Sequence, residues 1–502
     1  MSKVLHMYTR RRKKVVQTEL KFVEFSVPES SQLNARNRWV RLALLIPWDA
    51  FENQYALNFN GRGNEALPFR VALGTLIIQE QLCLTDREVV EEITENPYMQ
   101  YFLGYEKFLA DQPFDSSSLV HFRKRISADI LQQMNERIAF GEPEQTSPKQ
   151  DSSANEPDDK NEPPLSGKLI VDATCAPEDM KYPTDLGVLN DAREITEQVI
   201  DNLWEAGDPT VMNGIKPRTY RKKARNDFLS VIRKKKPKHS AIRKGIRKQI
   251  NYLARNLKTI SALVDKGVSL SVIDNVRYRK LLVAAEILRQ QTELFNRTNR
   301  RDRHVSDRIV SVSKPHVRPI VRGKARVAVE FGAKISASVI DGMFLLDSHS
   351  WGSYNECGDL INQAEKFKAR TGHFPASIHA DQIYRTSANR AWCKVKGIRL
   401  SGPPLGRPPE DPDVQKEMRR IRKRDEIDRI EIEGKFGVGK RRFGLGLIMT
   451  KLRETSEHAV ALVFVVMNLN KILRDLLLSI LEMVVKMSFG KILSEKIRFQ
   501  KA

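Results

Sequence analysis

The stretch GKLIVDATCAP, residues 167–177, is a short apolar run with β-branched residues between a glycine and a proline. This pattern predicts a buried β-strand, and the strand carries Asp172 near its end. A second run, ASIHADQIYR at residues 376–385, predicts another strand that delivers Asp381 near its end. Because a rigid sheet can hold such side chains in a crevice, the two acids are candidates for one shared site.

The segments around these strands predict a mixed sheet flanked by helices. The stretches ISASVID (335–341) and MFLLDSH (343–349) are joined by Asp341-Gly342, which is a strong hairpin signal. Two helices and a further strand are predicted in the sequences that follow: NECGDLINQAEKFKARTG (355–372), SANRAWCKVKG (387–397) and IRLSG (398–402). This order favours an α/β domain, which we expect over residues 168–455.

A helical insertion is expected within this domain at about residues 190–325. Residues 216–258 are rich in Lys and Arg and contain one acid, Asp227. Apolar residues at helical spacing predict two helices joined by a turn at DKGVS (265–269). The basic run is either a solvated charged face or a track for phosphates, and we favour the second. The residues proposed to contact DNA here are Arg221, Lys222, Lys223, Lys234, Lys235 and Lys236.

The overall composition points to a polyanionic partner. The 502 residues include 85 Lys and Arg against 62 Asp and Glu, a formal net charge of +23. The four cysteines are scattered without paired spacing, which argues against a disulfide framework and a structural zinc finger. Neither a signal peptide nor an apolar run of membrane-spanning length is evident, so we expect a cytoplasmic protein without a membrane contact.

The remaining segments predict an all-α domain before the sheet. Residues 37–140 have helical spacing, and Thr85 with Glu88 forms a plausible capping box. A short helix bearing Arg123, Lys124 and Arg125 follows, which suggests either a helix-turn-helix-like DNA contact or a packed domain with a solvated basic face. Three further segments are expected around these domains: a basic arm (1–36), an acidic disordered linker (141–167) and C-terminal helices (456–502).

The chemistry of the paired acids suggests divalent metal ions. Asp172 and Asp381 would repel each other unless cations joined them, and Mg²⁺ or Mn²⁺ prefers oxygen ligands. Two such ions can support in-line displacement at phosphorus, and a third carboxylate normally completes the site. Glu431 and Glu433 are the nearby candidates.

Both glutamates lie in EIEGKFGVGKRRFG, residues 431–444, which contains the GxxxxGK frame of a phosphate-binding loop. The preceding sequence is charged and helical in pattern, and Arg441 stands where such a loop needs Ser or Thr, so a nucleotide site is not expected. We predict instead a helix that ends at Gly434 and is followed by a basic loop.

These residues resemble the DDE transposases of bacterial insertion sequences, in the group whose RNase H-like catalytic domain follows a helical InsH-like domain. Many of these enzymes contain the motif Y-(2)-R-(3)-E-(6)-K, and Arg429, Glu433 and Lys440 match its last three positions. Glu426 stands at the tyrosine position, so no role of that tyrosine is carried over. Similar stretches are VDAT, HADQIYRT, GIRLSGPPLGRP, LPFRVALGTLIIQE and SSLVHFRKR.

The resemblance implies that Asp172, Asp381 and Glu433 hold two Mg²⁺ or Mn²⁺ ions and that Arg429 and Lys440 contact phosphates. It also implies a bacterial, nucleoid-associated DNA transposase that cuts at terminal inverted repeats and transfers the strand, acting as a homodimer on double-stranded DNA. Two alternatives remain: a catalytically silent DNA-binding protein and a metal-dependent nuclease without strand transfer.

Other polar residues are expected to have ordinary roles. His379 and His349 lack a third partner at ligand spacing and are interpreted as packed or surface histidines. Asp347 and Glu356 are interpreted as surface or capping residues.

Overall fold

The computed structural model describes seven ranges of the chain, which are residues 33–59, 66–141, 163–207, 215–297, 305–321, 329–406 and 409–499. Most of the expected basic arm and of the acidic linker lies outside these ranges. Within them, no helix combines the length and apolar character that crossing a bilayer requires.

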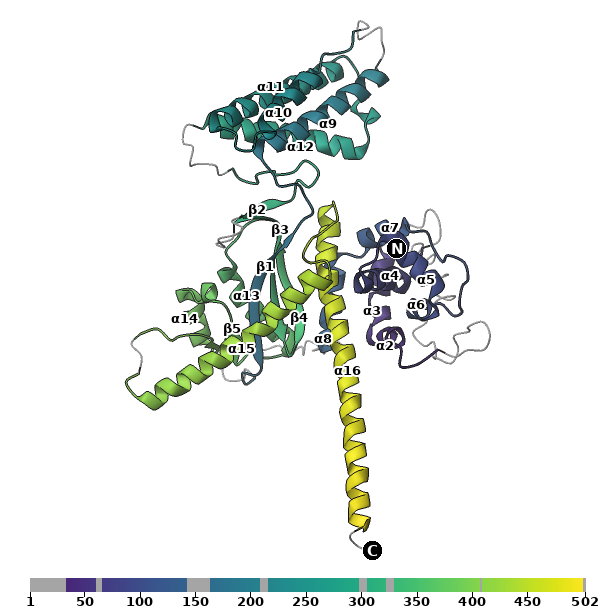
Figure 1. The fold of residues 1–502 in the computed structure, drawn as a ribbon, viewed down its shortest axis with the longest axis vertical. Helices are drawn as coiled ribbons and strands as arrows, with labels where there is room; N and C mark the ends of the chain where they lie inside the picture. The colour runs from purple at the N-terminus through teal and green to yellow at the C-terminus, as the bar shows by residue number, and fades with distance from the viewer. Residues whose placement is uncertain are drawn as a thin grey trace, which may run out of the picture.

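A mixed sheet lies at the centre of the α/β part, as the order of predicted elements indicated (Figure 1). Strand β1 pairs in parallel with β5 and antiparallel with β3, and β5 continues in parallel to β6. Strand β6 thus forms one edge of the sheet. The opposite edge is formed by β2 and β4, which both pair antiparallel with β3. The strands are β1 (Lys168–Pro177), β2 (Arg318–Val321), β3 (Val329–Ile340), β4 (Met343–Ser350), β5 (Ser377–His379) and β6 (Arg399–Leu400).

The hairpin between β3 and β4 is confirmed. Ile340 pairs with Met343, so Asp341 and Gly342 form a two-residue turn. Their φ angles are 48° and 75°, the left-handed values that a tight hairpin turn needs at both positions. Asp and Gly tolerate these angles better than most residues, which is why the dipeptide fixes the register of the two strands.

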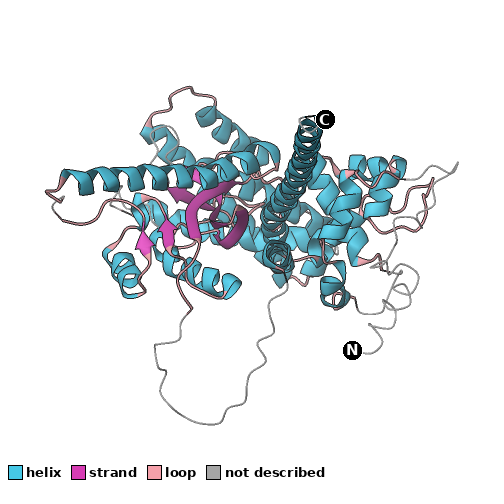
Figure 2. Cartoon of the chain, turned by 90° about the horizontal axis from the view of Figure 1, so that it is seen from below, coloured by secondary structure: helices cyan, strands magenta, loops and turns pink. Residues whose placement is uncertain are grey.

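Helices cover both faces of the sheet (Figure 2). Leu169, Val171 and Leu345 face a core shared with α13 (Asp359–Thr371) and α14 (Ser387–Val395). Alternate residues, including Ile170 and Phe344, face a second core shared with α8 (Ala128–Phe140), α15 (Pro412–Arg442) and α16 (Arg453–Phe499). Because side chains alternate along a strand, Asp172 and Thr174 lie on the face toward α15.

Helix α15 does not end at Gly434, so that prediction was wrong. The helix continues through Gly434, Gly437 and Gly439 to Arg442. Each interior glycine costs a helix about 1 kcal/mol, but packing outweighs this cost here. Phe436 is buried in the core, and a Cβ at Gly439 would lie 3.2 Å from Leu445 Cδ2. The stretch that contains the GxxxxGK frame is therefore helical and forms no phosphate-binding loop.

The N-terminal helices share the core of the α15 face instead of forming a separate one. They are α2 (Arg38–Leu45), α3 (Trp48–Ala56), α4 (Phe69–Leu82), α5 (Asp86–Glu95), α6 (Pro97–Phe102), α7 (Ser118–Arg125) and α8. The capping box predicted at Thr85 and Glu88 is present at the start of α5. A single helix, α16, replaces the several C-terminal helices expected, and its buried part lies between α2–α7 and the sheet (Figure 1).

The insertion between β1 and β2 forms a helical bundle beyond one end of the sheet (Figure 1). The two predicted helices are present as α11 (His239–Asp265) and α12 (Asn275–Asn296), and the apolar residues Ile250, Leu253 and Ile260 of α11 are buried. Two helices that the sequence pattern did not indicate, α9 (Asp185–Ala206) and α10 (Arg221–Ile232), complete the bundle.

Candidate active site and nucleic-acid contacts

Strands β1 and β5 are parallel neighbours and bring Asp172 and Asp381 together at their carboxyl ends. The last parallel pair is Ile170 with His379, and each acid lies two residues beyond its member of that pair. Asp381 begins a short 3-10 turn, and its Oδ1 accepts a hydrogen bond of 2.7 Å from the backbone of Gln382. Open α/β sheets commonly bind ligands at the carboxyl ends of adjacent parallel strands. The carboxyl ends of β1 and β5 are therefore a suitable place for a site.

Asp172 is mostly enclosed, and burial raises the pKa of its carboxyl group to about 6. The backbone N–H of Ala173 donates a hydrogen bond of 2.8 Å to Oδ1, which opposes the rise, as does the charge of Arg429. The negative charges of Asp381 and Glu356 raise the pKa further. A carboxylate in this position gains from a neighbouring cation.

Arg429 joins the second and third predicted acids. Its Nη2 lies 3.5 Å from Asp381 Oδ1 and 3.5 Å from Glu433 Oε1. Both carboxylates are more than half exposed, whereas the Arg429 side chain is 20% exposed. A positive group thus lies between Asp381 and Glu433, and its charge also lowers the pKa of Asp172. The three carboxyl groups offer the oxygen donors that a divalent cation such as Mg²⁺ prefers.

Arg429, Glu433 and Lys440 lie on nearly the same side of α15, because the offsets 433 − 429 = 4 and 440 − 429 = 11 are close to whole helical turns. Lys440 Nζ donates a hydrogen bond of 2.8 Å to Thr174 Oγ1 on β1. Glu431 points elsewhere, with Oε1 3.8 Å from Lys435 Nζ. The helix geometry therefore favours Glu433 over Glu431 as the third acid.

Two acids that were interpreted as surface or capping residues, Glu356 and Asp347, have specific partners. Glu356 forms an ion pair with Lys334 and is close enough to Asp172 to affect its pKa. Asp347 is not a surface residue, contrary to expectation: it is 4% exposed, and Oδ1 lies 2.7 Å from Arg370 Nη1. Neither contact could be read from the sequence, because both join segments that only folding brings together.

The three basic residues of α7 have different surroundings. Arg123 pairs with Asp86 and donates a hydrogen bond of 2.8 Å to Gln79 Oε1, which ties α7 to α4 and α5. The Arg125 guanidinium lies over the Phe59 ring at 4.4 Å from its centroid. Lys124 is exposed. Of the three, Lys124 is the residue whose charge is most available to DNA.

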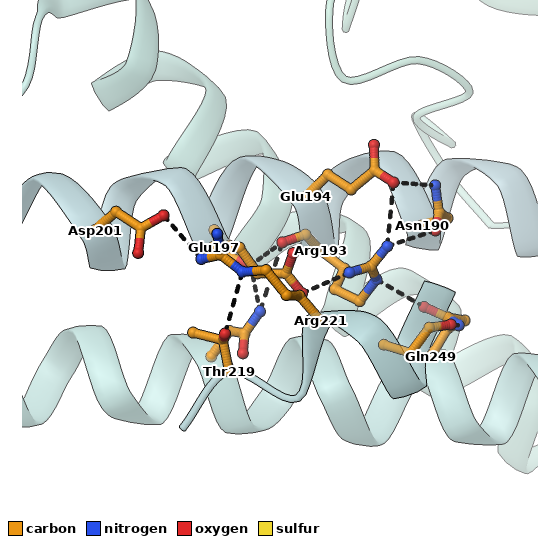
Figure 3. Close-up of polar contacts among 11 residues, drawn as sticks. Asn190, Arg193, Glu194, Glu197, Asp201, Thr219, Arg221 and Gln249 are labelled. Carbon is orange, nitrogen blue, oxygen red and sulfur yellow. Dashed lines mark hydrogen bonds and ion pairs between the residues drawn. The ribbon is translucent and has the colours of Figure 1, made fainter. Parts of the chain in front are cut away.

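In the insertion, Arg221 is held by an acid whereas the lysines are exposed. Arg221 Nη2 lies 2.8 Å from Asp201 Oδ2, and Lys216 Nζ lies 2.9 Å from the other oxygen of the same carboxylate. Figure 3 shows Arg221 on one side of a polar network around the buried Arg193, whose guanidinium contacts Asn190, Glu194, Glu197 and Gln249. The exposed lysines of the proposed phosphate track are Lys222, Lys223, Lys234, Lys235 and Lys236.

A cleft of about 520 Å³ borders this network. It is lined by Arg221, Lys222 and Arg225, but also by Glu194 and Glu197. Because the cleft is lined by both positive and negative side chains, we expect it to bind a polyanion more weakly than the exposed lysines of α10 and of the segment after α10 do.

Two family models match the chain. Residues 378–470 match a transposase DDE domain, and residues 28–125 match a transposase domain (DUF772). The first range contains Asp381, Arg429, Glu433 and Lys440, and the second contains the basic residues of α7. These matches confirm the resemblance to DDE transposases.

A curated relative, the uncharacterized protein ORF8 in the nfe locus of Rhizobium meliloti, is 36% identical to this chain over 102 residues. The match covers 20% of this chain and 49% of that protein, so the chain spans about half the length of the relative. No solved structure matches the chain.

Proposed function

From the two transposase-domain matches, we propose that this chain is a DNA transposase that binds the terminal inverted repeats of its own mobile element, cuts there and joins the ends to target DNA. The observation that carries the proposal is that Arg429 Nη2 lies 3.5 Å from both Asp381 Oδ1, just after β5, and Glu433 Oε1 on α15, and that the charge of Arg429 affects the pKa of Asp172 on β1. The segments that supply these acids are far apart in the sequence.

In this proposal, Asp172, Asp381 and Glu433 hold two Mg²⁺ or Mn²⁺ ions. When bound, such ions would supply activation of an attacking oxygen and stabilisation of a leaving oxygen at phosphorus. The chain's own contribution is positional: the sheet fixes Asp172 and Asp381, and α15 fixes Glu433 relative to them. Arg429 and Lys440 offer cationic groups on the same side of α15, where they contact the phosphates next to the cut.

The proposed domain architecture is that of an RNase H-like catalytic domain at 168–455 with a helical insertion, preceded by DNA-binding helices at 37–140 that share its core on the α15 face. The strand order, with β1 between an antiparallel and a parallel neighbour, supports this reading. The exposed lysines of the insertion and Lys124 of α7 supply phosphate contacts. Because two element ends must meet, we propose that the chain acts as a homodimer on DNA.

The proposal is tested with labelled DNA that carries the sequences flanking the gene, a target plasmid and Mg²⁺ or Mn²⁺. The expected result is cleavage at the ends followed by a joined product. Asp172→Asn, Asp381→Asn and Glu433→Gln should each reduce both products below detection while end binding is retained. Glu431→Gln is the matched control on the same helix and should retain activity. Unchanged cleavage in Asp172→Asn would rule out the proposed site.

The same assay separates the two alternatives. Cleavage without joined product would identify a metal-dependent nuclease. Binding of the ends without any cleavage by the unmodified chain would identify a catalytically silent DNA-binding protein.

A further inference from the structure

His379, the last residue of β5, lies opposite Asp425 and Asp428 of α15. His379 Nδ1 lies 3.5 Å from Asp425 Oδ1 and 3.7 Å from Asp428 Oδ2, and the three ligand atoms all lie within 4.8 Å of one another. His379 was expected to lack a third partner, and folding supplies it: the two aspartates lie on one side of α15, one turn apart in the chain. The sequence does not show which helix face meets β5.

The His379 ring is 1% exposed, and within the described part of the chain Nδ1 has no hydrogen-bond partner. The other ring nitrogen, Nε2, lies 2.9 Å from Ser377 Oγ. A buried polar atom without a partner is costly and calls for an explanation. Here the atom is directed at two carboxylate oxygens from a distance too long for a good hydrogen bond.

These separations suit ligands of one metal ion. With metal–ligand bonds of about 2.0–2.2 Å, the ligand atoms of a tetrahedral zinc site lie about 3.4 Å apart. The observed separations from Nδ1 to the two carboxylate oxygens are close to this value. One imidazole nitrogen with two carboxylates suits a transition ion better than Mg²⁺, which prefers oxygen ligands alone.

The surrounding side chains orient the three groups as outer partners of a metal site do. Arg399 donates hydrogen bonds of 2.8 and 2.9 Å to the two oxygens of Asp425. Lys168 Nζ lies 3.1 Å from Asp428 Oδ1, which leaves Oδ2 directed toward His379. Ser377 holds the far side of the imidazole.

We propose that His379, Asp425 and Asp428 bind a divalent transition metal ion of the zinc type at a structural site distinct from the three catalytic acids. The positive charges of Arg399 and Lys168 already offset the negative charges of the two carboxylates, which weakens their attraction for the ion. We therefore expect the bound ion to exchange and a chelator to remove it. His379 precedes Asp381 by two residues, and Asp428 adjoins Arg429. The bound ion therefore fixes α15 against β5 and sets the position of Glu433 relative to Asp381.

The test measures Zn²⁺ binding to the full chain by calorimetry after removal of metals with a chelator. The experiment uses an Asp172→Asn/Glu433→Gln background in excess Mg²⁺, so that the proposed catalytic acids contribute little. We expect one Zn²⁺ per chain and a rise in Tm on addition of Zn²⁺. In the same background Asp428→Asn should weaken binding at least tenfold, as should His379→Gln. Glu426→Gln, an exposed acid of the same helix, is the control and should leave the affinity unchanged.

Asp428→Asn keeps the test valid if His379→Gln does not fold, because the Asp428 side chain is partly exposed whereas His379 is buried. The Tm of metal-free Asp428→Asn is compared with the Tm of the metal-free background chain to show that the variant folds. Co²⁺ in place of Zn²⁺ should give a visible absorption band that Asp428→Asn removes. The proposal is overturned if the background chain binds no Zn²⁺, or if Asp428→Asn binds Zn²⁺ as tightly as Glu426→Gln does. No strand transfer is measured, so the outcome is independent of the proposed function.

Discussion

Lys440 Nζ donates a hydrogen bond of 2.8 Å to Thr174 Oγ1, which joins the last turn of α15 to β1 two residues beyond Asp172. The bond links the helix that carries Glu433 directly to the strand that carries the first acid. Lys440 can therefore act in two ways, as a fixed link between these elements or as a cation for a phosphate. The two roles are separated by changing each partner in turn.

Thr174→Val removes the hydroxyl acceptor and leaves the lysine charge in place. We expect a loss of about 1 kcal/mol in the free energy of unfolding, typical of one hydrogen bond, with cleavage of the element ends reduced only a few-fold. Lys440→Met also removes the charge and should reduce cleavage at least tenfold more than Thr174→Val does. Equal losses in the two variants would show that Lys440 acts only as a link.

Two basic residues of α7 should affect different properties: Arg123 the stability of the fold, and Lys124 the affinity for DNA. Arg123→Ala leaves Asp86 without its ion pair and Gln79 Oε1 without the donor from Arg123, so we expect a lower Tm. Lys124→Ala should leave Tm unchanged and weaken DNA binding, with the salt dependence of log K reduced by about 0.9 if one phosphate contact is lost. Thermal unfolding and titration of labelled DNA at several salt concentrations measure the two effects. A Lys124→Ala variant with unaltered DNA affinity would count against α7 as a DNA contact.

The lysines that follow α10 should contribute to DNA affinity through charge alone. Replacing Lys234, Lys235 and Lys236 together by Ala should reduce the salt dependence of log K by about 0.9 for each lysine that contacts a phosphate. Because all three are exposed, the Tm should not change. Arg289→Ala is a control in the same bundle, since its guanidinium is already offset by Glu286 and Glu293. If both variants gave the same salt dependence as the unmodified chain, the phosphate track would lie elsewhere.

Two glycines of α15, Gly434 and Gly439, should differ in how replacement by alanine changes the free energy of unfolding. A Cβ at Gly434 meets nothing within 4 Å, so Gly434→Ala should raise the free energy of unfolding by about 0.5–1 kcal/mol through helix propensity. A Cβ at Gly439 would lie 3.2 Å from Leu445 Cδ2 and 3.3 Å from Met467 Sδ, so Gly439→Ala should give no such gain. Denaturant unfolding measures both. Destabilisation by Gly434→Ala would instead indicate that the helix ends there.

Stability should fall as the pH drops from about 6.5 toward 4 because of His458. The ring is fully buried where α16 meets the end of α7, and Nδ1 lies 2.7 Å from the carbonyl oxygen of Ile126. Burial lowers the pKa of His458 to about 4, so the unfolded chain takes up a proton at a higher pH than the folded chain does. The stabilisation present above pH 6.5 is lost as the pH falls, and the full difference is roughly 3 kcal/mol.

His458→Asn isolates this contribution, because an asparagine amide can donate to the same carbonyl without titrating. The difference in free energy of unfolding between the two proteins should change with pH between 7 and 4.5, with the unmodified chain losing more. A constant difference over this range would contradict the assignment to His458.

Local patterns were sufficient for several elements of the fold. The strand at Asp172, the turn at Asp341-Gly342 and the cap at Thr85 each depend on a few neighbouring residues, so their signals are contained in short stretches. The choice of Glu433 over Glu431 followed from the spacing of the family motif R-(3)-E-(6)-K, which lies within one short stretch. The roles of these acids in metal binding stay predictions.

Contacts between distant segments were beyond the reach of such patterns. Gly434 looked like a helix end because glycine is a poor helix former, yet packing of Phe436 and Gly439 keeps the helix intact. Asp347 looked like a surface acid, and Arg370 accounts for its burial.

By itself, the sequence determined the α/β class and the basic character of the insertion, because residue type and periodicity express these directly, while the candidate acids were taken from the match to the family motif. Only the tertiary structure decided that Arg429 lies between Asp381 and Glu433, that His379 faces two aspartates, and that α16 joins the N-terminal helices to the sheet in one core. These relationships depend on which faces pack together, and burial of apolar surface over the whole chain selects those faces.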